Sequence, residues 1–314
     1  MKRTTHFIFY TLVLSTFLFF ILTLNSCKEE VKGNGNDSKN TEDDIFELAT
    51  VAGNVANDDI TEASGIVASK NAAGFYWVHN DGGAGPENRL FLMDASGKDA
   101  GTVWLKDIEN IDWEDLTIGA GPEEDKNYLY VGQIGDNRAQ FNLRNIYRIE
   151  EPTIINGSIA QDTVKDIDVI TYKYPDGPRD AETLMIDPLT KDLYIISKRE
   201  PQINIYVARY PQSTSDTITL EKVGTLGFTQ ATAGDISADG TEILIKNYTN
   251  VFYWQRAEGQ SIEEALEAEP TEITYQIEPQ GEAITFAADG SGFFTLSEEA
   301  QGIEAILYYY PRVK

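Results

Sequence analysis

Cysteine, histidine and basic residues are scarce in this 314-residue chain. The one cysteine, Cys27, excludes an internal disulfide, so an exported domain would depend on its hydrophobic core. The two histidines, His6 and His79, provide no Cys/His cluster for zinc, and neither a Gly-x-Ser-x-Gly elbow nor a Gly-Lys-Ser/Thr phosphate loop is present. With 25 Lys and Arg against 51 Asp and Glu, the net charge of −26 argues against nucleic acid as a partner. What the chain has in excess is oxygen ligands.

Residues 1–26 are predicted to be a lipoprotein signal peptide. They begin Met-Lys-Arg, continue with an almost uninterrupted apolar run over residues 6–24, and end in a small residue before Cys27. A basic start, an apolar stretch and a small residue are typical of a secretory signal. The alternative is a retained transmembrane anchor, because the run is about long enough to span a bilayer. The end of the segment resembles the lipobox of bacterial lipoproteins, which implies that Cys27 is lipidated and holds the protein on a membrane.

Residues 27–44 are predicted to be a flexible tether. They are rich in Gly, Asn, Ser, Lys and Asp and cannot bury enough apolar surface to offset the entropy of ordering. The Lys-Glu-Glu at residues 28–30 resembles the export signal of Bacteroidetes lipoproteins. That resemblance implies the outer membrane and its cell-surface side, with the periplasmic face as the alternative.

Five short motifs recur along the rest of the chain. They are centred on Ser64, Glu114, Glu182, Gly234 and Glu282, at steps of 50, 68, 52 and 48 residues. A period near 50 residues is typical of propeller blades. Each motif is followed by a turn and by further strands rich in aromatic and β-branched residues. Second strands are predicted at 75–78, 128–131, 193–196, 242–245 and 293–296, and third strands at 89–93, 145–149, 203–209, 251–255 and 305–310.

The pattern predicts an all-β fold, a five-bladed β-propeller over residues 45–314. Fourth strands are predicted at 101–105, 168–174, 220–226 and 272–277, so the fifth unit lacks one. Residues 46–51 form an orphan strand that would close the ring beside the last blade and remove exposed sheet edges. The alternative is a six-bladed propeller with a degenerate blade around residues 156–168. Residues 260–269 are predicted to be one short surface helix with Ile262, Ala265 and Leu266 facing inward.

The motifs also predict a site. In an antiparallel blade the start of the innermost strand and the end of the second strand lie on one face, so both should ring the mouth of the channel. Carboxylates that share an axis repel one another unless a cation neutralises them or their pKa values rise. Calcium accepts about six to eight oxygens in loose geometry. We therefore expect a calcium held by Ser64, Glu114, Glu182 and Glu282, with Gly234 offering a carbonyl or leaving room for water; the alternative is a purely structural polar ring.

The order Ser, Glu, Glu, small residue, Glu resembles the soluble calcium-activated nucleotidases, which are apyrase-type five-bladed propellers. This resemblance implies calcium on Ser64, Glu114, Glu182 and Glu282 and hydrolysis of nucleoside di- and triphosphates above it; Gly234 departs from the second serine expected there. The chain also resembles a group of uncharacterised bacterial propeller lipoproteins through Asn-Asp, Asp-Trp-Glu-Asp, Gly-Asp-Asn and Arg-Asp-Ala-Glu signatures. These signatures lie at residues 80–81, 112–115, 135–137 and 179–182. That second resemblance implies a fold and no activity.

Two classes of function follow. In the first, calcium stiffens the ring of a monomeric protein whose channel mouth binds a small molecule, a glycan or a protein partner. The tryptophans available to stack on sugars sit in or beside predicted strands, which favours core packing; they are Trp77, Trp104, Trp113 and Trp254. In the second, the protein is a calcium-dependent hydrolase of phosphate esters or nucleotides. Its candidate catalytic residues are Asp81, Asp136, Asp180, Arg138, Lys198 and Lys246, with Arg199 as a further cation.

Overall fold

The computed structural model describes residues 45–82, 88–300 and 302–314. The predicted signal peptide, the tether and Cys27 lie outside these residues. Among the described residues, no helix is long and apolar enough to cross a membrane.

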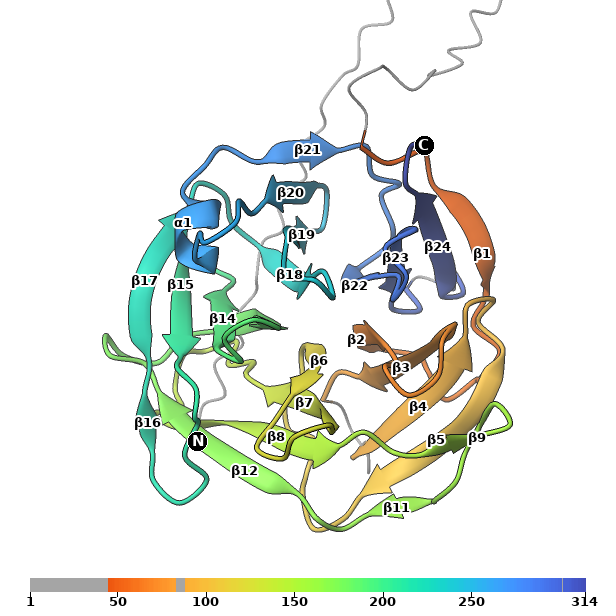
Figure 1. The fold of residues 1–314 in the computed structure, drawn as a ribbon, viewed down its shortest axis with the longest axis horizontal. Helices are drawn as coiled ribbons and strands as arrows, with labels where there is room; N and C mark the ends of the chain where they lie inside the picture. The colour runs from red at the N-terminus through yellow and green to blue at the C-terminus, as the bar shows by residue number, and fades with distance from the viewer. Residues whose placement is uncertain (1–44, 83–87, 301) are drawn as a thin grey trace, which may run out of the picture. The chain divides into compact units, whose positions relative to one another are not determined.

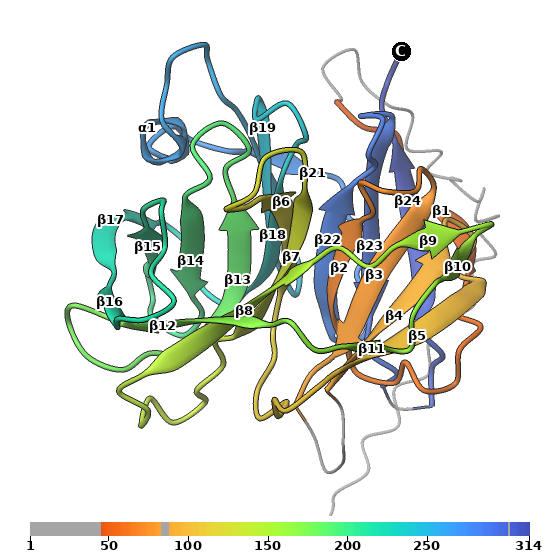
Figure 2. The same cartoon turned by 60° about the horizontal axis from the view of Figure 1, so that its bottom comes forward.

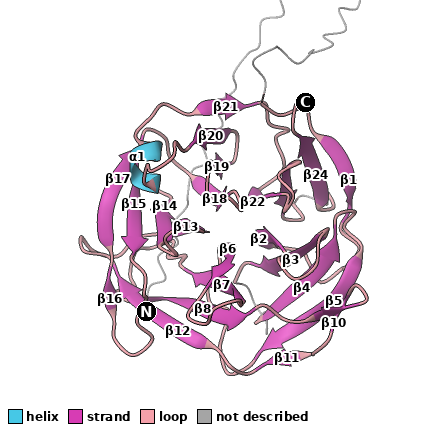
Figure 3. Cartoon of the chain, in the orientation of Figure 1, coloured by secondary structure: helices cyan, strands magenta, loops and turns pink. Residues whose placement is uncertain are grey.

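The described chain is almost entirely β-structure, as Figure 3 shows. Five sheets lie around a common axis, each with its first strand innermost (Figure 1). From the axis outward, blade 1 contains β2 (Ala63–Ala68), β3 (Phe75–Asn80), β4 (Arg89–Asp94), β5 (Asp99–Leu105) and β11 (Thr163–Val164). Blade 2 contains β6 (Leu116–Ala120), β7 (Asn127–Gln133), β8 (Arg144–Glu150), β12 (Asp168–Lys173) and β16 (Ile218–Thr219).

The other three blades have four strands each. Blade 3 contains β13 (Ala181–Ile186), β14 (Leu193–Ser197), β15 (Ile203–Ala208) and β17 (Glu221–Leu226). Blade 4 contains β18 (Ala231–Ile236), β19 (Glu242–Asn247), β20 (Val251–Gln255) and β21 (Thr271–Ile273). Blade 5 contains β22 (Gly281–Phe286), β23 (Gly292–Ser297), β24 (Ile306–Pro311) and β1 (Thr50–Asn54).

The predicted five-bladed propeller is therefore confirmed, including its closure by an N-terminal strand. β1 pairs antiparallel with β24, although it begins later than predicted, and Phe46 forms only an isolated bridge with Arg312. The six-bladed alternative is wrong. Residues 154–159 form a small hairpin of β9 (Ile154–Ile155) and β10 (Ser158–Ile159), and β11 joins the outer edge of blade 1 in parallel with β5 (Figure 2). The 68-residue step between the second and third motifs therefore contains a strand that covers the edge of blade 1 and no additional blade.

Packing between blades holds the ring together. Each of five hydrophobic clusters draws its side chains from two neighbouring blades, so every interface between blades has its own core. Trp77 and Trp113 are completely buried and Trp254 is 3% exposed, whereas Trp104 is 37% exposed, so three of the four tryptophans pack in the core. Fully burying one large apolar side chain contributes about 1.5–3 kcal/mol.

Many of the abundant acidic residues build turns and caps. In four turns between strands an aspartate accepts the backbone N–H two residues ahead; the donors are Ser96, Leu189, Thr241 and Ser291, at 2.8–3.0 Å. The predicted helix is confirmed as α1 (Ile262–Leu266), with a Ser261/Glu264 capping box and with Ile262, Ala265 and Leu266 buried. These acidic groups need no ligand to explain them.

Candidate functional site

Four inner strands begin with the same β-bulge, and this bulge fixes which motif residues are equivalent. The register shifts between Ala63 and Gly65 in β2, and in the same way at the starts of β13, β18 and β22. The extra residues are therefore Ser64, Glu182, Thr232 and Glu282. Glu114 holds the matching place in blade 2, since its neighbour Asp115 lies opposite Gly132.

The prediction that Gly234 is equivalent to Ser64 is wrong by two residues, because Thr232 takes that place. Gly234 instead occupies the position that is aliphatic in the other four blades. A Cβ there would lie 2.9 Å from Met185 Sδ and 2.9 Å from Thr183 Cγ2, so no aliphatic side chain fits. Because this position is not aliphatic in blade 4, the motif was aligned on the next aliphatic residue, Ile236, which is two residues too late. The steps are 50, 68, 50 and 50 residues once Thr232 is used.

The two hydroxyls of this ring link neighbouring blades. Ser64 Oγ donates a hydrogen bond to the backbone carbonyl of Glu114, and Thr232 Oγ1 donates to the carbonyl of Gly281 at 3.3 Å. Each bond joins the start of one inner strand to the start of the next. Both hydroxyl groups therefore have structural partners in the described protein.

The three glutamates of the ring converge, as predicted, and all are buried. Glu114, Glu182 and Glu282 are 2%, 4% and 6% exposed. Lys198 forms an ion pair with Glu182 and lies 3.9 Å from Glu282, while Tyr248 donates a 2.6 Å hydrogen bond to Glu282. Burial alone would lower the pKa of Lys198, but the two carboxylates raise it. Lys198 thus supplies a protein cation to one side of the ring.

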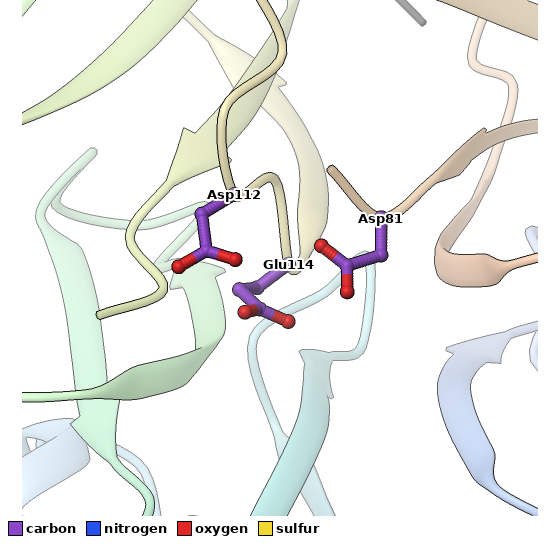
Figure 4. A group of neighbouring side chains, drawn as sticks. All are labelled: Asp81, Asp112 and Glu114. Carbon is purple, nitrogen blue, oxygen red and sulfur yellow. The ribbon is translucent and has the colours of Figure 1, made fainter. Parts of the chain in front are cut away.

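Two groups of carboxylates meet at Glu114. In the first group, oxygens of Asp81, Asp112 and Glu114 lie within 4.8 Å of one another, and Figure 4 shows the three side chains turned toward each other. In the second, the same holds for Glu114, Asp180 and Glu182. The second group has cations, because Arg199 Nε lies 2.5 Å from Asp180 and Lys198 pairs with Glu182. The first group, which we call the Asp81–Asp112–Glu114 cluster, has no ion pair with any described residue.

The loop that carries this cluster is fixed on both sides. Trp113 anchors it in the core, where its ring meets that of His79 edge-on at 5.6 Å. Asn110 Oδ1 accepts a hydrogen bond from the backbone N–H of Trp113 at 3.0 Å, and Asn110 Nδ2 donates one to the carbonyl of Asp81 at 3.2 Å. These bonds join blades 1 and 2. A Cβ on Gly135 would lie 2.1 Å from Glu114 Oε1, so only glycine allows the backbone this close to the carboxylates.

The cluster is electrostatically unfavourable without a cation. Burial and then the neighbouring Asp112 raise the pKa of Asp81 to about 7. Burial raises the pKa of Glu114 well above its ordinary value, and Glu182 and Asp81 add to the increase. The pKa of Asp112 is also raised by burial, although the Arg144 charge opposes this. Carboxylates that repel one another in a buried place gain most from a bound cation.

Most of the predicted catalytic residues are buried or already form hydrogen bonds or ion pairs within the protein. Asp136 accepts the backbone N–H of Phe141 at 2.7 Å, and Asp180 accepts that of Asp136 at 2.7 Å. Lys246 is fully buried against Thr232 and the carbonyl of Gly281, and burial lowers its pKa to about 8. Arg138 is exposed, and its side chain has no hydrogen bond or ion pair with any described residue. Asp81 is only half-buried and lies in the cluster, so it is the most accessible predicted base.

Sequence reasoning missed two charged residues near the cluster. Asp112 begins the Asp-Trp-Glu-Asp signature and is not among the predicted ligands, although its place two residues before Glu114 was the available signal. Arg144 is 4% exposed, and its Nε and Nη2 have no hydrogen-bond partner in the described protein. No local pattern distinguished Arg144 from the other arginines.

The chain is thus a five-bladed β-propeller with a carboxylate cluster where the inner strands of blades 1 and 2 begin. No protein-family model matches it, and no curated protein matches it either. Among solved structures, it is similar to a crystal structure of a nidogen/laminin complex, with a TM-score of 0.44 and 9% identity over 77% of this chain and 74% of that chain. The assignment of the fold rests on the five sheets themselves.

Proposed function

We propose that this protein is a membrane-anchored, extracytoplasmic β-propeller that holds a calcium ion at its channel mouth and binds a surface ligand there. The anchor is a lipid on Cys27, and the location is the outer membrane, on its cell-surface side. The ligand is a small molecule, a glycan or a protein partner, and the propeller acts as a monomer. The ion would be held by Asp81, Asp112 and Glu114.

One observation carries the calcium proposal. Glu114 belongs to both carboxylate groups and is 2% exposed, yet no described residue donates a hydrogen bond or offers a cation to its carboxylate. Such a carboxylate must either take up a proton or be neutralised by a cation, and the carboxylates of Asp81 and Asp112 beside it would let one cation neutralise all three. Glu182 and Glu282 already have partners in Lys198 and Tyr248, which favours an ion beside Glu114 over one beside Glu182 and Glu282.

Calcium, when bound, would supply charge neutralisation and open coordination positions for oxygens of a ligand. The residues of the chain do the rest. Trp113 and Asn110 hold the loop, while Asp81 and Asp112 are only half-buried and face an incoming molecule. A ligand that contributes its own carboxylate, hydroxyl or phosphate oxygens would fit this arrangement best.

Terbium luminescence tests the metal site. Trp113 lies between Asp112 and Glu114 in the chain, so excitation of tryptophan should sensitise a lanthanide bound there. We expect terbium emission that calcium displaces in the wild type and in Glu242→Gln, whose ion pair with Arg312 lies elsewhere. Glu114→Gln should lose the emission. Equal emission from Glu114→Gln would place the ion elsewhere and overturn the assignment.

The anchor and the ligand need separate measurements. Cys27→Ala should move the protein from the membrane fraction to the soluble fraction after export, and protease treatment of intact cells should cleave the wild type. A glycan array probed with calcium and then with a chelator should show calcium-dependent retention. Retention that survives both chelation and Glu114→Gln would separate ligand binding from the metal.

A calcium-dependent hydrolase of phosphate esters or nucleotides is the second candidate, and Arg144 favours it. This buried guanidinium has two nitrogens without partners, and its charge acts on Asp112 in the cluster. A cation beside a metal would stabilise negative charge on a phosphoryl group, with Asp81 orienting or deprotonating water. Incubation with nucleotides and phosphate esters plus calcium should then give turnover that Asp81→Asn abolishes. No turnover across the panel would remove this candidate.

A further inference from the structure

A groove with a volume of about 680 Å³ lies between the outer parts of blades 3 and 4. Its apolar side chains include Phe228 and Phe252, whose rings stack at 4.0 Å, and Trp254. One wall is formed by residues 223–227, in and just after the second half of β17, and the other wall by residues 267–270, after α1. The volume falls within the range of about 300–1,000 Å³ typical of binding sites.

The groove lies beside the outer strand of blade 3, at the place where the outer strands of blades 1 and 2 each pair with an additional strand. β11 precedes the outer strand of blade 2 and pairs in parallel with β5, the outer strand of blade 1. In the same way, β16 precedes the outer strand of blade 3 and pairs in parallel with β12. The corresponding segment before β21 contains α1 and residues 267–270 and does not pair with β17. β17 is therefore an open edge, as are β21 and β1 in blades 4 and 5, whereas β5 and β12 are covered.

The open edge can take a further strand. β17 has six residues, no proline and only β15 as a paired neighbour among the described strands. Its bulge lies at Val223, toward the start of the strand, and leaves Gly224 to Leu226 in regular register. Unpaired N–H and C=O groups on such an edge bind extended chains by main-chain hydrogen bonds.

The negative charge of the groove favours a basic ligand. Every charged residue that lines it is a glutamate: Glu263, Glu267, Glu269 and Glu272. Glu263 is already paired with Arg209 at 2.6 Å, and Glu272 accepts a hydrogen bond from Asn250 at 3.1 Å. The side chains of Glu267 and Glu269 are exposed and have no hydrogen bond or ion pair with any described residue. Acidic walls above an aromatic floor match lysine or arginine side chains alternating with apolar ones.

We propose that this groove binds an extended, basic segment of a partner protein, which adds to β17 in parallel and takes the place that β11 and β16 take in blades 1 and 2. Apolar side chains of the segment would pack on Phe228, Phe252 and Trp254. Basic side chains would meet Glu267 and Glu269. This surface is separate from the Asp81–Asp112–Glu114 cluster, so its test does not depend on the metal.

The test uses fluorescence anisotropy of a labelled peptide as long as β17, six residues, with alternating lysine and valine. The full chain should bind it at physiological ionic strength, where screening over about 8 Å suppresses distant charges. The double variant Glu267→Lys/Glu269→Lys should bind at least about tenfold more weakly, which corresponds to about 1.4 kcal/mol. The matched control Glu47→Lys/Glu124→Lys changes the net charge equally at exposed sites outside the groove and should bind like the wild type.

Two further peptides make the outcome decisive. A glutamate/valine peptide should not bind, and a lysine/valine peptide N-methylated at alternate residues should lose binding, because it cannot pair with a strand edge. Equal weakening by both double variants would show diffuse attraction to an acidic surface. Unchanged binding of the methylated peptide would exclude strand addition. Either result, or no binding by any peptide, would overturn the proposal.

Discussion

Glu114 and Asp115 are neighbours in the chain, both are buried, and burial raises the pKa of both. Their surroundings nevertheless differ completely. Asp115 accepts three backbone N–H groups, from Leu116 at 2.8 Å, Leu184 at 2.9 Å and Gly234 at 3.3 Å. No described residue donates to the Glu114 carboxylate. Burial and a raised pKa do not distinguish the two residues; the number of hydrogen-bond donors separates the carboxylate that joins the blades from the one that we propose as an ion ligand.

The same contrast extends to other aspartates. Asp235 accepts hydrogen bonds from Ile236 N, Phe286 N and Thr285 Oγ1 at 2.8–2.9 Å, so it joins blades 4 and 5 as Asp115 joins blades 2, 3 and 4. Within the part of the chain that the structure describes, in contrast, the side chains of Asp81 and Asp112 form no hydrogen bond to another blade. Inter-blade bonding is thus a property of one set of carboxylates and not of acidic residues in general.

Asp115→Ala gives the largest expected effect. It leaves buried N–H groups on β6, β13 and β18 without acceptors, each costing about 1–3 kcal/mol, so the free energy of unfolding should fall by about 4–6 kcal/mol. Urea denaturation of the metal-free protein measures this. Glu114→Gln should cost almost nothing in the same experiment or should stabilise. Equal losses for the two variants would erase the distinction between the neighbours.

Lys198→Met converts paired carboxylates into unpaired ones. Glu182 and Glu282 would lose their buried cation, and removing one partner of such a pair costs about 3–5 kcal/mol. Calcium should restore part of this loss, because the variant offers additional unpaired oxygens. Chemical denaturation with and without calcium measures both quantities. A loss that calcium leaves unchanged would show that carboxylates without partners do not by themselves attract the ion.

Calcium should stabilise the wild type more than it stabilises Glu114→Gln. At about 100 times its dissociation constant, a ligand that binds only the folded state adds about 2.7 kcal/mol. The melting temperature of the wild type should therefore rise on addition of calcium, while that of Glu114→Gln should stay constant. Magnesium provides the comparison, since it demands stricter octahedral geometry and should act more weakly. An identical rise in both proteins would argue against Glu114 as a ligand.

The smallest expected effect concerns Asp235. Burial outweighs its three hydrogen bonds and raises its pKa from 3.8 to about 6. The folded protein therefore retains a proton that the unfolded chain releases, so stability should fall as the pH rises from about 4 to about 6 and then level off. The side chain is partly exposed, so the fall should be about 1–2 kcal/mol, less than the full shift implies. Asp235→Asn should flatten this part of the stability curve; an unchanged slope would assign it to other groups.

The fold was readable from the sequence because strands and turns leave local signals. The run at residues 193–196 became β14, and the small helix appeared with its three inward residues as expected. The strand that closes the ring was also found, but its position was not, since residues 46–54 alternate weakly and their pairing partner lies near the other end of the chain. Local patterns fix the elements well, and distant pairing fixes their bounds.

The site was only partly readable for the same reason. The convergence of Glu114, Glu182 and Glu282 follows from the repeat, so it could be expected. Glu182 and Glu282 differ from Glu114 because Lys198 and Tyr248 contact them from positions directly after the second strands of blades 3 and 4, and no spacing rule predicts such contacts. The register error at Gly234 came from packing against Met185, a contact between blades. The metal assignment itself stays a prediction.

Closure of the ring by β1 and β24 has a consequence for how the protein folds. Thr50 meets Tyr309 across 259 residues, so this pairing forms only after nearly the whole domain has been synthesised. Bringing such distant segments together costs about 5 kcal/mol of chain entropy, which the last sheet must offset when it assembles. β1, the first strand to be synthesised, is thus among the last to pair. Until then blade 5 stands incomplete, and this is the stage at which a chaperone would matter most.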